Sequence, residues 1–132
     1  MARKPNVRVQ PLPLIAVNDV EASSRFYRKL LGCESGHGGR TYETLVNQGN
    51  VVLQLHAWDE EEHPNLMNRD EARPGHGVLL WFQINEFESA VERAHSLRAR
   101  IVEEVHVNPN SGQQELWLAD PDGYLVVLAD GD

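Results

Sequence analysis

The sequence contains two similar segments placed 67 positions apart. Residues 18–23 (NDVEAS) begin the first segment, and residues 85–90 (NEFESA) begin the second. Each follows an apolar run typical of a β-strand, and each starts an amphipathic helix that leads back into strand-rich sequence. Because a unit of about 65 residues is too small to bury both faces of its own sheet, we predict two paired modules in one domain over residues 1–132.

The predicted order of elements is βαβββ in each module. We expect module one over about residues 8–57, a polar and acidic loop over 58–75, and module two over about 76–130. The first strand, residues 8–17, carries Pro11 and Pro13, which restrict it to a sheet edge or to exchange with another chain. In module one, two or three further strands are expected up to His56, with a turn at residues 48–50. In module two, strands are expected at 77–84, 101–107, 113–119 and 124–129.

Capping residues mark the ends of the two predicted helices. Asp19 or Asn18 can cap the first helix, and Gly32 is placed to end it. Asn85, followed three residues later by Glu88, indicates a capping box for the second helix. These signals place both helices directly after a strand.

The charge and cysteine content exclude several classes of function. The net charge of −8 disfavours binding to a nucleic-acid backbone. The single cysteine, Cys33, excludes an intramolecular disulfide and a Cys-rich zinc site, and we expect it to pack beside the first helix. The sequence shows no secretory signal and no apolar run of membrane-spanning length, so we expect a soluble cytoplasmic protein that binds no membrane.

Strand alternation separates a core face from a face that can bind a ligand. In the alternating strands, aliphatic residues such as Leu53, Leu80 and Leu116 share one face, and aromatic or polar residues share the other. A mixture of rings and a few polar groups is typical of a small-molecule pocket. We therefore predict ligand contacts from Gln54, His56, Trp58, Trp81, Gln83, Glu115 and Trp117.

Each of these residues also has a structural interpretation. The tryptophans can be core or rim residues, His56 and the two glutamines can be satisfied by internal hydrogen bonds, and Glu115 can be a solvated edge residue. The acidic run at residues 59–62 can be a solvated loop or can attract a cation. His37, His76 and His106 are interpreted as surface or loop residues.

Residues 12–32 (LPLIAVNDVEASSRFYRKLLG) and 120–128 (DPDGYLVVL) together resemble the glyoxalase, bleomycin-resistance and extradiol-dioxygenase superfamily, also called vicinal oxygen chelate proteins. The resemblance covers nearly the whole chain. It implies an α+β fold in which two βαβββ modules form a cup-shaped mixed sheet that holds the site.

The resemblance also implies where a metal would bind. The metal-dependent members take ligands from four strand positions, which fall here on Leu12, Gln54, Leu79 and Val127. Three of these side chains are aliphatic, and an amide is a weak ligand for a transition metal. The sequence therefore predicts no metal ligand at these positions and no cofactor.

Within the superfamily, residues 12–27, Trp81 and residues 114–124 are similar to the metal-free bleomycin-resistance branch. That similarity implies a homodimer, with exchange of the first strand at Pro13. It also implies sequestration of a planar or cationic compound such as an antibiotic, rather than catalysis.

Two other functions remain open from the sequence. One is a metal-dependent glyoxalase-like lyase, isomerase or dioxygenase that holds a divalent transition metal with a displaced set such as Gln54, His56, His76 and Glu115. The other is an interaction module with a cup filled by its own side chains. The sequence contains no nucleophile elbow, phosphate loop or H-E-x-x-H helix, and we assign no catalytic residue.

Overall fold

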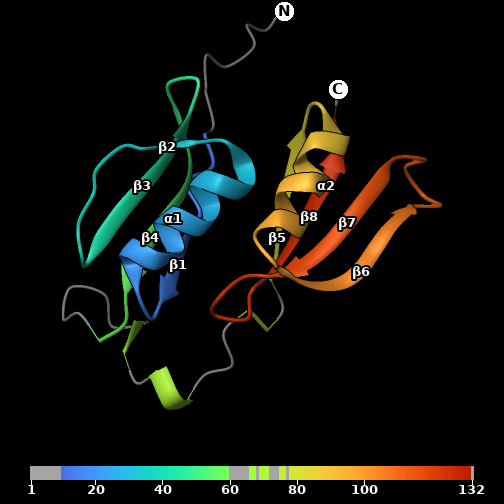
Figure 1. Ribbon diagram of the computed structural model, residues 1–132. Helices are drawn as coiled ribbons and strands as arrows, with labels where there is room; N and C mark the ends of the chain where they lie inside the picture. Colours follow the sequence, from blue (N-terminus) through green and yellow to red (C-terminus); the bar gives the residue numbers. More distant parts are fainter. Residues whose placement is uncertain (1–9, 60–65, 68, 72–74, 77, 132) are drawn as a thin grey trace, which may run out of the picture.

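Two four-stranded sheets, each with one helix, make up the computed structural model (Figure 1). The structure describes residues 10–59, 66, 67, 69–71, 75, 76 and 78–131. The N-terminal module contains β1 (Leu14–Val17), α1 (Val20–Leu31), β2 (Glu34–Ser35), β3 (Tyr42–Asn47) and β4 (Asn50–Ala57). The C-terminal module contains β5 (Leu79–Ile84), α2 (Phe87–Ser96), β6 (Arg100–Val107), β7 (Gln114–Ala119) and β8 (Leu125–Asp130).

The strand orders are β1-β4-β3-β2 and β5-β8-β7-β6, with the first pair of each sheet parallel and the others antiparallel. This arrangement confirms the prediction of two βαβββ modules in an α+β fold. Most of the predicted loop over 58–75, including the acidic residues 60–62, lies outside the described residues. Within that loop a short 3-10 helix spans Arg69–Glu71.

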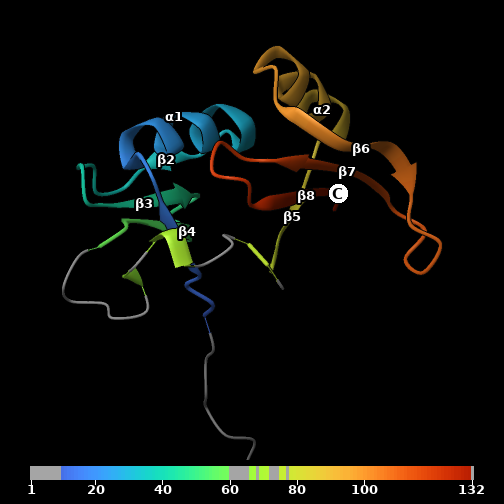
Figure 2. The ribbon, with the colours of Figure 1, turned by 90° about the horizontal axis from the view of Figure 1, so that it is seen from below.

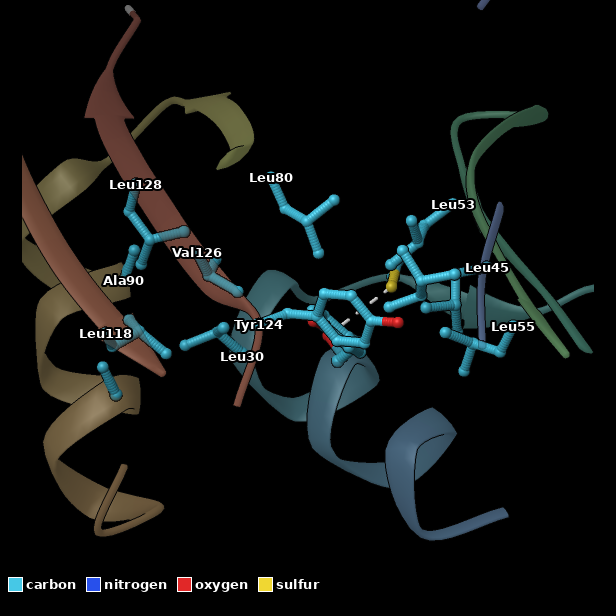
Figure 3. Packing of buried hydrophobic residues seen from close by; sticks show 14 of the residues in the cluster. Leu30, Leu45, Leu53, Leu55, Leu80, Ala90, Leu118, Tyr124, Val126 and Leu128 are labelled. Carbon is cyan, nitrogen blue, oxygen red and sulfur yellow. Dashed lines mark hydrogen bonds between the residues drawn. The ribbon is translucent and has the colours of Figure 1, made fainter. Parts of the chain in front are cut away.

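Both helices lie on the same side of the two sheets (Figure 2). One hydrophobic cluster joins the modules, because it contains Leu30 of α1 and Ala90 of α2 together with strand residues of both sheets (Figure 3). The buried strand residues include Leu53, Leu55, Leu116, Leu118, Val126 and Leu128, all fully buried. Each sheet therefore has a helix-covered face and an opposite face, which we call the open face.

The first strand is shorter than predicted. β1 begins at Leu14, and residues 10–13 form no strand. Pro11 and Pro13 have no N–H group to donate to a ladder. The carbonyls of this segment are still used, since the Gln54 backbone N–H donates to Pro13 O at 2.8 Å and Gln54 Nε2 donates to Leu12 O at 2.9 Å.

The caps of α1 are as predicted, whereas the predicted cap of α2 is wrong. The Asp19 carboxylate accepts the Ala22 N–H at 2.9 Å, and Gly32 ends α1 with φ of 71°. For α2 the N-cap residue is Glu86, with φ of 50° and no side-chain capping bond. Because this position has left-handed rather than extended backbone, the Asn85–Glu88 capping box does not form.

The turn after β7 is hydrogen-bonded to the N-terminal module. Tyr27 of α1 donates its hydroxyl to Asp120 at 2.7 Å, and Tyr124 donates its hydroxyl to the Ala16 carbonyl at 2.8 Å. The backbone N–H of Asn18 donates to Asp122 at 2.7 Å. Burial raises the pKa of Tyr27, and the neighbouring Asp120 carboxylate raises it further. The DPDG sequence therefore serves both as a hairpin turn and as the junction between modules.

No helix among the described residues is long and apolar enough to cross a membrane. Cys33 is buried and its thiol lies 3.6 Å from the Tyr27 carbonyl, as expected for a small packed residue beside α1. Burial raises the pKa of this thiol, which makes it less reactive.

Candidate ligand-binding site on the open face of the C-terminal sheet

Two tryptophans lie on the open face of the C-terminal sheet with one small residue between them. Trp81 of β5 pairs with Val127 of β8, which pairs with Trp117 of β7. Residues in register on adjacent strands project to the same face. Since the neighbouring residues Leu116 and Leu118 are in the core, this row of side chains lies on the opposite, open face.

The next row carries the polar side chains. Gln83 pairs with Ala129, which pairs with Glu115. Val127 and Ala129, the short residues at the centre of the two rows, are fully buried, whereas Trp81 is 45% exposed. The centre of this face is thus apolar, and the larger side chains around it shield it from solvent.

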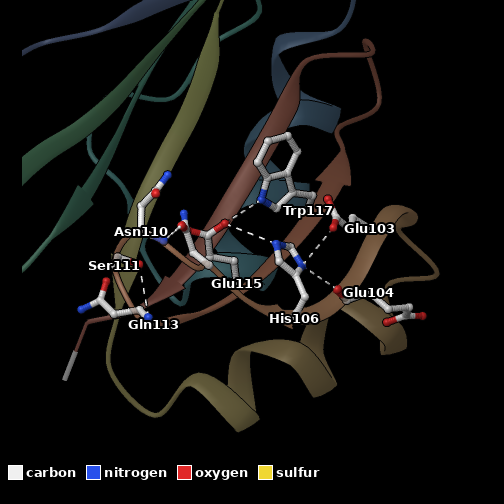
Figure 4. A network of polar contacts seen from close by, with 9 residues as sticks. Glu103, Glu104, His106, Asn110, Ser111, Gln113, Glu115 and Trp117 are labelled. Carbon is white, nitrogen blue, oxygen red and sulfur yellow. Dashed lines mark hydrogen bonds and ion pairs between the residues drawn. The ribbon is translucent and has the colours of Figure 1, made fainter.

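Glu115 is a buried carboxylate held by three side chains (Figure 4). Trp117 Nε1 donates to Oε1 at 3.0 Å, Asn108 Nδ2 donates to Oε2 at 2.8 Å, and His106 Nε2 lies 3.4 Å from Oε1. Burial acts to raise the pKa of Glu115, but the bonds from Trp117 and Asn108 and the nearby His106 outweigh it and hold the pKa below its usual range. Glu115 therefore carries a negative charge at neutral pH beneath the open face.

His106 reaches this cluster because β6 is irregular. Glu103 pairs with Trp117 and His106 pairs with Glu115, so three steps along β6 match two steps along β7. Strict alternation would turn His106 to the other face from Glu103, whereas the bulge brings both to the open face. The sequence indicated a surface or loop position for His106, and the side chain is indeed partly exposed, on β6. Its contact with Glu115 was not predicted, because no sequence signal marked the bulge.

The predicted residues of the N-terminal module lie on a different sheet. Gln54 and His56 occupy the open face there, with Tyr42 of β3 opposite His56. Tyr42 donates its hydroxyl to Gln54 Oε1, and Gln54 Nε2 donates to the Leu12 carbonyl. Both the oxygen and the nitrogen of this amide are therefore hydrogen-bonded within the protein. His56 is buried, with Nδ1 2.8 Å from the Ala57 carbonyl. The predicted contacts are therefore divided between two sheets.

Trp58 lies one residue beyond β4 and is half-buried. It belongs to the end of the N-terminal sheet, so the structure does not place it in either row of the C-terminal open face. Of the seven residues predicted to bind a ligand, Trp81, Gln83, Glu115 and Trp117 form the compact set.

A second buried carboxylate, Glu43 of β3, was not singled out in the sequence. Its oxygens accept the Ser24 hydroxyl at 2.7 Å and the Ser35 hydroxyl at 2.8 Å. They also accept the backbone N–H groups of His37, Gly38 and Thr44, at 3.2, 2.6 and 3.0 Å. Burial acts to raise the pKa of Glu43, but these bonds outweigh it and lower the pKa. With five donors already bound, Glu43 holds the glycine-rich loop after β2 against α1.

A family model described as the Glyoxalase/Bleomycin resistance protein/Dioxygenase superfamily matches residues 9–128. The chain belongs to this superfamily. Its members include both metal enzymes and binding proteins, so membership alone does not choose between them. A comparison with curated protein sequences gives no match.

Solved structures of low sequence identity share the fold. An integron cassette protein from V. cholerae aligns with a TM-score of 0.72 at 19% identity, covering 98% of this chain and 100% of that one. TioX from Micromonospora sp. ML1 aligns at 0.70 and 14% identity, covering 95% and 100%. A glyoxalase-related enzyme from Fulvimarina pelagi aligns at 0.75 and 17% identity, covering 94% and 88%.

The four positions that superfamily metal enzymes use do not suit a metal here. Leu12 and Leu79 are about half exposed, and Val127 is fully buried between the two tryptophans. Gln54 is the one polar side chain, and both ends of its amide are bonded. The side chains at the other three positions contain no oxygen, nitrogen or sulfur atom that could bind a metal. These four positions therefore support no metal-dependent chemistry.

The displaced ligand set is not assembled either. Among the described residues, no three His, Cys, Asp or Glu side chains are placed to share a metal ion. His56 is on the N-terminal sheet, Glu115 is on the C-terminal sheet, and His76 precedes β5. The structure does not gather these residues in one place.

Proposed function

We propose that this protein binds a planar, cationic small molecule without a metal, on the open face of the C-terminal sheet. The observation that carries the proposal is the row Trp81–Val127–Trp117, with the ionised Glu115 in the adjacent row. Two indoles separated by a short residue offer stacking surfaces to a flat ring system. The protein would act by stoichiometric capture of its ligand.

The charge of the site favours a cation over a neutral ring. Aromatic faces attract cations, and the attraction grows when the site excludes water. Glu115 adds a fixed negative charge beneath the rings, and the net charge of −8 raises the local concentration of cations around the protein. A cationic antibiotic belongs to this ligand class, in keeping with the bleomycin-resistance members of the superfamily.

We propose that a second copy of the chain covers part of this face. Leu12, Val78, Leu79 and Trp81 are each between 44% and 51% exposed. The last three border, with Pro11 and Pro13, a groove of about 570 Å³ between the modules. A homodimer in which the segment before β1 lies against the partner would bury this apolar surface.

The oligomeric state tests this part of the proposal. We expect sedimentation equilibrium to give a dimer for the natural protein and a monomer for Leu79→Lys. Val102→Lys is the matched control, because Val102 is also about half exposed but lies on β6. A monomeric natural protein would remove the dimer from the proposal.

Ligand binding is tested with a pair of dyes that differ in charge. At pH 8, 10-methylacridinium is a permanent cation and acridine is neutral, and both are flat three-ring systems. We expect the cation to quench indole fluorescence with an affinity about tenfold above that of acridine. Trp81→Leu and Trp117→Leu should each weaken binding of the cation by about tenfold.

Trp58→Phe is the control for the dye experiment, because Trp58 lies outside the two rows. It should lower the total fluorescence and leave the affinity unchanged. Equal affinity of the natural protein, Trp81→Leu and Trp117→Leu for the cation would refute the proposed site.

A further inference from the structure

His106 is placed between two carboxylates at the edge of the proposed site. Its Nε2 lies 3.4 Å from Glu115 Oε1, and its Nδ1 lies 3.6 Å from Glu103 Oε1 and 2.9 Å from the Glu104 carbonyl oxygen. The Trp117 ring is 6.4 Å away, centre to centre. The imidazole side chain is 26% exposed, so it can exchange protons with water, whereas the Glu115 side chain is 2% exposed.

The hydrogen bonds assign the proton of the neutral imidazole. A backbone carbonyl can only accept, so the short contact between Nδ1 and the Glu104 oxygen places the N–H on Nδ1. Nε2 then carries a lone pair, which faces the Glu115 carboxylate. A second proton on His106 goes to Nε2, the nitrogen nearest Glu115, and forms an ion pair there.

We propose that His106 determines which ligand charge the open face accepts, by offsetting the charge of Glu115 when it is protonated. The proposal rests on the proposed function, since it concerns the same site. With neutral His106, Glu103 and Glu115 together present two negative charges. With protonated His106 the net charge of the three groups falls to one, and the attraction for a cationic ring system decreases.

Glu115 keeps its own charge whether or not His106 carries a second proton. Its pKa is held below the usual carboxylate range by the bonds from Trp117 and Asn108 as well as by His106. Glu103 is on β6 and about half exposed, so water screens its charge more than that of Glu115. The titratable and charged groups that face His106 are thus Glu103 on its own strand and Glu115 on β7, with Glu104 contributing its carbonyl.

Proton binding and cation binding must oppose each other in equal measure. If a proton on His106 weakens the cation, the bound cation lowers the proton affinity of His106 by the same factor. At a pH where His106 carries the second proton in part of the protein, binding of the cation should therefore release protons. A residue that only supports the structure would not produce this release.

The test uses 10-methylacridinium, whose charge does not change with pH, and measures its dissociation constant at pH 8 and pH 5.5. This interval spans the ordinary titration of histidine side chains. We expect the affinity of the natural protein to fall about fivefold more across the interval than that of His106→Gln. Calorimetry in buffers of different ionisation heat should show proton release in the natural protein and its loss in His106→Gln.

His95→Gln is the matched control. His95 of α2 lies 3.4 Å from Glu104, the same imidazole–carboxylate distance as in the His106–Glu115 pair, but outside the site. His95→Gln should keep the pH dependence and the proton release of the natural protein.

The possible failures are distinguishable. Absence of cation binding at pH 8 would overturn the proposed function itself. The cation could instead bind at pH 8 with the same pH dependence and proton release in the natural protein and in His106→Gln. That result would overturn the role of His106 and leave the proposed function standing. Loss of the pH dependence in His95→Gln as well would also overturn it, because the effect would then be a general one of surface charge.

Discussion

Glu43 and Glu115 are both buried, charged carboxylates, one in each module, but they are held by different kinds of donors. Glu43 faces α1 and binds two serine hydroxyls and three backbone N–H groups. Glu115 is on the open face and is held by the side chains of Trp117, Asn108 and His106. The pKa of each is below its usual range, although burial acts to raise both.

The difference in donors separates a structural role from a functional one. Backbone groups around Glu43 do not titrate or move independently, so this carboxylate fixes the shape of a loop. Around Glu115 the partners are side chains rather than backbone groups, and one of them is an imidazole that can accept a second proton. We infer that burial and a lowered pKa alone do not mark a binding site, whereas replaceable partners on an open face do.

The largest effect should come from removing the structural carboxylate. Glu43→Ala leaves three backbone N–H groups and two hydroxyls without their acceptor, and unsatisfied buried groups are costly. We expect the free energy of unfolding to fall by about 3 kcal/mol or more, measured by urea denaturation. Glu34→Ala on β2 is the control, since Glu34 is exposed and should change stability by less than about 0.5 kcal/mol.

A smaller effect should come from the junction that holds the two modules together. Tyr27→Phe removes a buried 2.7 Å hydrogen bond to the Asp120 carboxylate, a class of bond worth about 2 kcal/mol. Tyr124→Phe removes a bond to a neutral carbonyl and should cost about 1 kcal/mol. Equal losses of unfolding free energy in the two variants would show that the charge of Asp120 does not strengthen the junction.

The pH dependence of stability should reveal both carboxylates. Because the pKa of each is lower in the folded state than in the unfolded state, their stabilisation is present above the ordinary carboxylate range and is lost as the pH falls through the folded values. The unfolding free energy should therefore decline from pH 5.5 toward pH 3. The decline should be shallower in Glu43→Gln and in Glu115→Gln.

Asp120 contributes to this titration with the opposite sign. Burial raises its pKa despite the hydrogen bond from Tyr27, so its protonation on acidification favours the folded state. A pH profile that is unchanged by both glutamine variants would contradict the assignment of Glu43 and Glu115 as charged.

Glu115→Gln should have a small effect on stability and a larger effect on ligand binding. The amide keeps an acceptor for one donor, so the unfolding free energy should fall by about 1 kcal/mol. Affinity for 10-methylacridinium should fall by about tenfold, and affinity for neutral acridine should not change. Equal weakening of both dyes would indicate that the substitution disturbs the face rather than its charge.

Much of the fold followed from local patterns in the sequence. The repeated segments at 18–23 and 85–90 predicted two βαβββ modules, and the superfamily resemblance is confirmed by the match over residues 9–128. The Asp19 and Gly32 caps were also correct, because a cap depends on a few adjacent residues. The Asn85 cap failed because the backbone at Glu86 enters α2 with positive φ.

The sequence alone determined which residues share a face. Consecutive side chains of a strand project to opposite sides whatever the rest of the chain does, so Glu115 and Trp117 were separated correctly from Leu116 and Leu118. The tertiary structure alone decided which side chains from different strands lie next to one another. Pairing across strands set Trp81 and Trp117 on either side of Val127, and the bulge in β6 turned His106 toward Glu115. Register and bulges depend on the energy of whole strand pairs, which no short stretch of sequence contains.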